Sequence, residues 1–187
     1  MKKYNFILLI VLLLFFVGCA NIEKTVKTEN KGNVTLSATN DKIFIDVKSM
    51  DETSTFPFRM TKDNVVIKLK ELKLEVKNEI EITSEEDDPE FGNKQIWTDG
   101  IIFSFDKNND LYCINVNENI PTSLHLKKGD SLEKTENLYG KKYTKHNTDT
   151  ALVYEYTFAD HYFRVFLEED KVTQWVVSKY KLSNYHH

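Results

Sequence analysis

The chain opens with one unbroken apolar run and continues with short apolar runs separated by polar residues. The first run covers residues 6–17, and no later stretch is apolar over a comparable length. The later runs are mostly about five to eight residues long and rich in Val, Ile, Tyr and Phe, which is typical of β-strands. The pattern predicts a folded domain preceded by an N-terminal segment of a different kind.

The first half of this domain predicts a hairpin, a mixed segment and a meander. Residues 34–38 and 42–47 are β-prone, and the Asn-Asp pair between them suits a tight turn. After a polar loop, residues 62–83 fit both an alternating strand and a helical stripe. We therefore expect a short strand near residues 64–68 and then a helix to about residue 80. Three β-rich runs separated by turn residues then predict a meander: 94–98, 101–105 and 111–116.

The second half begins with a helix signal. Gly129 is followed by Asp130 and Ser131, either of which can cap a helix, and Gly140 ends that helix. Three β-like runs come after it: 151–158, 162–167 and 172–177. Each half therefore has a helix, a polar loop and a hairpin closed by an acidic turn, so we expect an internal duplication.

These elements predict an α+β fold in which helices pack on one face of curved antiparallel sheets, arranged as two repeats. We place the first half at residues 33–120, the second at 121–182 and a short tail at 183–187. A chain of 187 residues with 41% hydrophobic residues can bury an ordinary core.

The N-terminal segment has the layout of a secretory signal peptide. Two lysines precede the apolar run, which is shorter than the roughly 20 residues that a membrane-spanning helix needs. Gly18-Cys19-Ala20 at its end resembles the bacterial lipobox, although Phe16 stands where Leu is usual. The resemblance implies cleavage after residue 18 and a diacylglycerol on Cys19. An uncleaved signal anchor is the alternative.

This interpretation places the domain outside the cytoplasm, held to the cell membrane by lipid on Cys19, since two acyl chains anchor a protein stably. Residues 19–32 are polar and aperiodic and predict a flexible tether. The net charge of −4 does not favour a nucleic-acid partner, which needs a basic surface. Once Cys19 is acylated, only Cys113 remains, so no intrachain disulfide is expected.

The second half resembles the β-lactamase-inhibitor-like family of domains, which includes small outer-membrane assembly lipoproteins and lipoproteins of Gram-positive bacteria. The resemblance rests on residues 128–140, on Tyr154-Glu155-Tyr156 and on the hairpin formed by 163–167 and 171–176. It implies helices on one face of a sheet whose open face binds proteins, in an inhibitory or scaffolding role. The first half matches loosely because it lacks the Gly-Asp-Ser helix start.

Motifs for metals and cofactors are absent or incomplete. Residues 106–110 have the spacing of a calcium loop, but Leu111 and Asn117 stand where that loop needs Gly and Glu, so we expect a hairpin turn. The histidines lack metal-ligand spacing except for the terminal pair, and Ser131 is not in a nucleophile elbow. We therefore expect no metal, no cofactor and no enzymatic activity.

Aromatic residues crowd the last third of the chain. Tyr154, Tyr156 and Phe158 share one face of a predicted strand, and Trp175 lies on another strand. We take these four residues as the candidate partner surface, since Tyr and Trp dominate protein interfaces. The alternative is that neighbouring elements cover both faces of the sheet.

The sequence therefore predicts a membrane-anchored, extracytoplasmic module that binds a protein partner in an inhibitory, immunity or scaffolding role. One alternative is a lipoprotein that binds a small ligand, sugar or peptide between its two halves. A less favoured alternative is a cell-wall hydrolase, for which Glu155, Asp160 and Glu168 are the nearby carboxylates.

Overall fold

The computed structural model of the protein describes residues 42–81, 94–148 and 151–181. Several predicted features lie outside these residues: the signal peptide, Cys19, the tether, the first arm of the hairpin and the C-terminal tail. For these features the sequence-based predictions stand as predictions.

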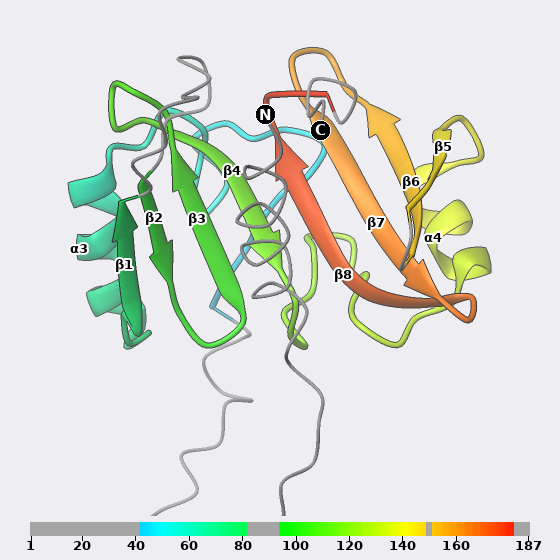
Figure 1. The fold of residues 1–187 in the computed structure, drawn as a ribbon, viewed down its shortest axis with the longest axis horizontal. Helices are drawn as coiled ribbons and strands as arrows, with labels where there is room; N and C mark the ends of the chain where they lie inside the picture. Colours follow the sequence, from blue (N-terminus) through cyan, green and yellow to red (C-terminus); the bar gives the residue numbers. More distant parts are fainter. Residues whose placement is uncertain (1–41, 82–93, 149–150, 182–187) are drawn as a thin grey trace, which may run out of the picture. The chain divides into compact units, whose positions relative to one another are not determined.

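The strands of the described residues form one eight-stranded antiparallel sheet with the order β1-β2-β3-β4-β8-β7-β6-β5 (Figure 1). The four strands of each half are neighbours, and the halves meet where β4 pairs with β8. The strands are β1 Asn78–Glu81, β2 Lys94–Trp97, β3 Ile101–Phe105, β4 Leu111–Val116, β5 Thr144–Asn147, β6 Leu152–Thr157, β7 Tyr162–Glu168 and β8 Lys171–Ser178. The last strand of each half therefore lies at the centre of the sheet.

The predicted α+β class is wrong, because the described residues form a mainly β structure. Their only helices are α3 (Lys62–Leu72) and α4 (Leu132–Tyr139), which span 11 and 8 residues. One continuous sheet carries the fold in place of a helical layer packed on separate sheets. Much of the cover over its core face comes from residues 42–60, which contain neither helix nor strand.

Residues 64–68, predicted as a strand, lie within α3. Thr61 caps this helix by accepting a hydrogen bond from the backbone N–H three residues on, and Val65 and Leu69 are buried one turn apart. Lys73 adopts a left-handed conformation (φ 59°) that ends the helix. The predicted continuation to residue 80 is therefore wrong, and β1 forms there instead.

The predictions for α4 and for both meanders are confirmed. The Lys134 N–H donates to Ser131 Oγ (3.2 Å), and Gly140 ends the helix with φ 88°. Strands β2–β4 and β6–β8 pair in the predicted order. Strand β5 was not predicted, because it is a polar edge strand without an apolar run.

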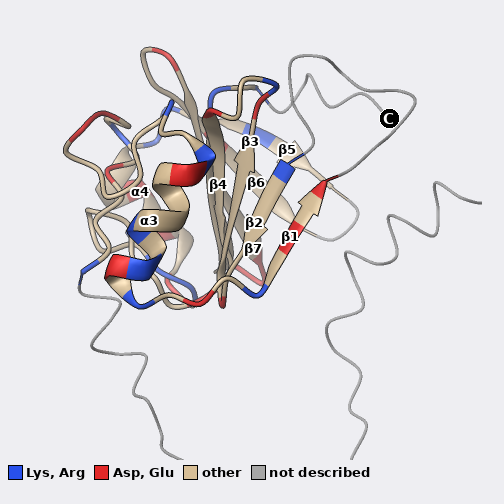
Figure 2. Ribbon diagram, turned by 90° about the vertical axis from the view of Figure 1, so that its left-hand side faces the viewer, with Lys and Arg blue, Asp and Glu red and all other residues tan. Residues whose placement is uncertain are grey.

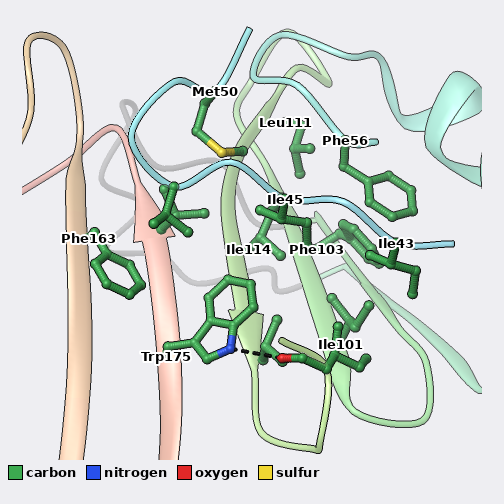
Figure 3. Close-up of a cluster of buried hydrophobic side chains, with 14 of the residues drawn as sticks. Ile43, Ile45, Met50, Phe56, Ile101, Phe103, Leu111, Ile114, Phe163 and Trp175 are labelled. Atoms are coloured by element: carbon green, nitrogen blue, oxygen red, sulfur yellow. Dashed lines mark hydrogen bonds between the residues drawn. The ribbon is translucent and has the colours of Figure 1, made fainter. Parts of the chain in front are cut away.

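The hydrophobic core lies on one face of the sheet (Figure 3). Residues 42–47, predicted as the second arm of a hairpin, carry no strand, yet Ile45 in this segment is fully buried. Phe56 packs against Phe103 of β3 with ring centroids 4.7 Å apart. The apolar alternation of 42–47 therefore reflects burial against the sheet and not pairing with another strand.

The two halves repeat backbone details as well as the order of their elements. The N-cap residue of each helix bridges to a residue at the start of the last strand of its half: Thr61 to Asp110 and Ser131 to Lys171. Two residues before each cap, Arg59 (φ 66°) and Gly129 (φ 87°) have left-handed backbones. Their N–H groups donate to carbonyl oxygens of that last strand (3.0 and 2.7 Å). Arg59 thus occupies the position that glycine holds in the second half.

Because Arg59 and Gly129 occupy equivalent positions, we expect substitutions at these two positions to differ in their effect on the free energy of unfolding. Gly129→Ala is expected to lower the free energy of unfolding by about 1–2 kcal/mol, because a side chain disfavours the left-handed conformation. No atom lies within 4 Å of the position of the added Cβ, so the cost comes from the backbone alone. Arg59→Gly relieves the same strain and is expected to be neutral or stabilising. Urea unfolding followed by circular dichroism measures both, and a clear loss of stability in Arg59→Gly would contradict the equivalence.

Candidate functional site

The four aromatic residues predicted as a partner surface do not form an exposed surface. Tyr154, Tyr156 and Trp175 are buried in the core, and Phe158 is half-buried beside His161. Burial raises the pKa of Tyr156, whose hydroxyl donates to the carbonyl of Gly140. The choice of these residues was wrong, because β6 turns Tyr154 and Tyr156 toward the side of the sheet that carries the core.

The opposite face of the sheet is the better candidate, and strand register defines it in three rows. The first row is Asn78, Trp97, Ile102, Asn115, Val176, Arg164, Glu155 and Thr144. The second row is Ile80, Gln95, Ser104, Cys113, Ser178, Tyr162 and Thr157. The third row is Gln174, Phe166, Val153 and His146. We call these residues the neutral face.

The neutral face is nearly free of charged residues, although 29% of the chain is Asp, Glu, Lys or Arg. Within these three rows the only Asp, Glu, Lys or Arg side chains are Glu155 and Arg164, which neutralise each other. The next register pair on this side, Glu168 and Lys171, carries opposite charges and lies at the rim, where the β7–β8 turn begins. Figure 2 shows charged residues along α3, whereas the middle strands of the sheet carry few. A solvated face of an antiparallel sheet normally alternates polar and charged residues with the core positions. The composition of the neutral face is therefore that of a covered surface.

A buried ion pair lies near the middle of the second half of this face. Arg164 Nε donates to Glu155 Oε2 at 2.7 Å, and both side chains are almost fully buried. His146 Nε2 lies 3.7 Å from the other carboxylate oxygen of Glu155. The Arg164 guanidinium also donates to the carbonyl of Tyr180, which follows β8. The corresponding positions of the first half hold an uncharged pair, Trp97 and Ile102.

The first half of the neutral face presents an oriented indole. Trp97 Nε1 donates to Gln95 Oε1 at 2.8 Å, and Gln95 Nε2 donates to Ser104 Oγ at 3.4 Å. These bonds link Trp97 to its own strand and to β3, and the ring stays only half-buried. In the neighbouring strand β4, the Asn115 Oδ1 atom is buried and accepts no hydrogen bond from the part of the chain that the structure describes. A buried acceptor without a donor is costly, so this atom is available to a donor from a binding partner.

Reactive or metal-binding chemistry has little support in the described residues. Burial raises the pKa of Cys113 to about 11, which keeps its thiol protonated at neutral pH. No cluster of His, Cys, Asp and Glu in the described ranges could hold a metal ion. Asp106 accepts backbone hydrogen bonds from Asn108 (2.8 Å) and Asp110 (3.0 Å), so the predicted hairpin turn is confirmed.

The carboxylates considered for a hydrolase lie in different surroundings. Glu155 is paired with Arg164, Asp160 lies in the turn before β7, and Glu168 ends that strand. Two open hollows of about 380 and 430 Å³ are lined by first-half residues only, so neither lies between the halves. None of the helices described here is long and apolar enough to cross a membrane.

Comparisons with known proteins add one distant similarity. No protein-family model matches the sequence, and a search of curated proteins finds no match. The structure is similar to the crystal structure of a DUF4309 family protein (YjgB) from Bacillus subtilis subsp. subtilis str. 168. The two chains are 11% identical, the similarity covers 76% of this chain and 90% of that chain, and the TM-score is 0.46.

Proposed function

We propose that this protein is a lipid-anchored module outside the cytoplasm that binds a protein partner through the neutral face. Cys19 supplies the anchor, and the sheet supplies the binding surface. The observation that carries the binding proposal is a sheet face almost without charge in a chain rich in charged residues. The inhibitory or scaffolding role suggested by the family resemblance belongs to this proposal.

The chemistry of the neutral face supports a protein partner. The cores of protein interfaces are depleted in Lys, Glu and Asp and enriched in aromatic residues and Arg. The neutral face offers Trp97, Tyr162 and Phe166 as half-buried aromatics, and its one arginine is paired. Aromatic residues of this kind are the usual anchors of binding energy. The small-ligand alternative finds less support, because the hollows described above lie away from this face.

A charge placed on the neutral face tests the proposal. Ile102→Glu puts an unpaired carboxylate beside Trp97, and we expect it to abolish retention of a partner from cell-envelope extract by the immobilised full chain. Ile67→Glu is the matched control, because Ile67 is 54% exposed on α3. Circular dichroism establishes that both variants fold. Equal retention by the two variants would rule out the neutral face as the binding surface.

The anchor is tested separately. We expect Cys19→Ser to move the protein from the membrane fraction into the soluble or secreted fraction and to abolish incorporation of labelled fatty acid, because no thiol remains to accept the lipid. Cys113→Ser is the control and is expected to stay with the membrane. Lipid labelling that survives in Cys19→Ser would refute the anchor.

A further inference from the structure

The sheet has two open edges, which are formed by β1 and β5. In the part of the chain that the structure describes, each of these strands pairs with one neighbour only, β1 with β2 and β5 with β6. The two strands lie at opposite ends of the strand order (Figure 1). In each of them three of the four residues are exposed. The outer backbone N–H and C=O groups of such an edge can pair with a strand of another molecule.

The two edges carry opposite charges. Strand β1 contains Glu79 and Glu81, whereas β5 contains Lys145 and follows Lys141 and Lys142. The three lysines are exposed, and the side chains of Glu79 and Glu81 are 50% and 66% exposed. Each edge is therefore complementary in charge to the other edge and not to itself.

The ion pairs that the two glutamates form within the chain leave them open to a second cation. Lys62 Nζ lies 2.6 Å from Glu79 Oε2, and Lys94 Nζ lies 3.8 Å from Glu81 Oε1. Exposed pairs of this kind are weak, and a carboxylate has two oxygens that accept several donors. A lysine from another molecule can therefore contact either glutamate without breaking its internal pair.

The charged side chains of both edges lie on the same side of the sheet. The neutral face takes the first and third residues of β1 and of β5, so strand alternation turns Glu79, Glu81 and Lys145 to the opposite side. Lys145 Nζ lies over the ring of Tyr154, a core residue, which places Lys145 on the core side. When the two edges meet with their neutral faces aligned, their opposite charges therefore also meet.

The number of strands allows the two edges to pair. The eight strands are antiparallel at every step of the order, so β1 and β5 run in opposite directions within one copy. When a second copy stands beside the first with its neutral face on the same side, β5 of one copy meets β1 of the other as an antiparallel pair. The hydrogen-bonding pattern of the sheet then continues across the junction.

Strand register brings opposite charges together at this junction. With Lys145 opposite Glu79 of the neighbouring copy, Thr144 lies opposite Ile80, and the neutral residues stay on one side. A shift by two residues puts Lys145 opposite Glu81 and also keeps the faces aligned. Opposite charges directly across a strand pair stabilise it, whereas pairing β1 with β1 or β5 with β5 sets like charges against each other.

We propose that copies of this protein associate edge to edge, β5 of one copy with β1 of the next, to form a continuous sheet. The contact joins two different edges, so a free edge remains at each end and further copies can add. The neutral faces of adjoining copies lie on the same side of the joined sheet. The association goes beyond the proposed function and does not depend on it.

Carbodiimide crosslinking of the full-length protein in detergent, over a range of protein concentrations, tests the junction. The reagent joins a lysine amine directly to a carboxylate that it contacts. Within one copy Lys145 cannot reach Glu79, because seven strand spacings of about 4.8 Å each separate β5 from β1. We expect covalent dimers and longer chains in which mass spectrometry finds Lys145 linked to Glu79 or Glu81.

Charge reversal tests whether unlike edges meet. Lys145→Glu alone, and Glu79→Lys/Glu81→Lys alone, are each expected to lower the association constant about tenfold in sedimentation, because like charges then face each other across the junction. Mixing the two variants should restore association, because each supplies the edge that complements the other. Lys107→Glu, an exposed change in the β3–β4 turn, is the matched control and should associate as the native protein does.

Circular dichroism establishes that each variant folds, and the linked residues of the native protein decide the test if one does not. Native protein that forms no link from Lys145 to Glu79 or Glu81 would overturn the proposal. Reversed variants that associate as strongly as the native protein, or a mixture that stays dissociated, would overturn it as well. In that case the short, charged edges protect the sheet from pairing.

Discussion

Replacing Trp175 with alanine is expected to lower the free energy of unfolding by about 3–5 kcal/mol, the usual cost of removing a large buried aromatic. Trp175 is fully buried in the core between the halves of the sheet, and its ring centroid lies 6.3 Å from the ring centroid of Phe163 (Figure 3). Its Nε1 also donates to the carbonyl of Ile120 at 3.1 Å. Since small domains are stable by about 5–15 kcal/mol, this loss takes a large fraction of the total.

Trp175→Phe separates packing from hydrogen bonding. Phenylalanine keeps much of the ring but leaves the buried Ile120 carbonyl without its donor, so we expect a smaller loss of about 1–3 kcal/mol. Urea unfolding followed by far-ultraviolet circular dichroism measures both variants. A loss below about 1 kcal/mol in Trp175→Ala would show that Trp175 is not a core residue and would return it to the candidate binding surface.

Breaking the Glu155–Arg164 pair is the second large effect. Arg164→Ala leaves a carboxylate in the interior without its guanidinium partner, and we expect a loss of about 3–5 kcal/mol in the free energy of unfolding. The double variant Glu155→Leu/Arg164→Met removes both charges together and should recover most of that loss. The first half supports this expectation, because Trp97 and Ile102 occupy the corresponding positions without any charge.

A double-mutant cycle measures this pair. The single variants Glu155→Leu and Arg164→Met are each expected to be much less stable than the double variant, because each removes one member of the buried pair and keeps the charge of the other. Strictly additive losses would mean that the two side chains stabilise the fold independently.

Local signals in the sequence were enough to predict α4 and both meanders. Ser131 and Gly140 fix the ends of α4 through capping and a left-handed backbone, which need no knowledge of the rest of the chain. The equivalent signals of α3 are hidden, because Arg59 occupies the position of Gly129 and the apolar residues near Val65 alternate as in a strand. The predicted strand at 64–68 follows from that missing glycine and from the alternation. The predicted continuation of the helix to residue 80 has another cause, because Lys73 and not a glycine adopts the left-handed conformation that ends α3.

The candidate site could not be predicted, because alternation separates the two faces of a strand without saying which face is covered. In β6, Tyr154 and Tyr156 belong to one face and Glu155 to the other, and all three are buried. Large aromatics suggested an interface, but they fill the core. The neutral face became recognisable only when strand register brought residues from eight strands together.

The central claim is that the neutral face binds a protein, and photo-crosslinking in living cells tests it most directly. The full-length protein would carry a benzophenone amino acid in place of Trp97 or Phe166 on this face, or in place of Ile67 or Phe44, which are exposed elsewhere. The account predicts a crosslinked protein adduct from the two neutral-face positions and none from the two controls. Adducts from the control positions alone, or from none of the four, would contradict it.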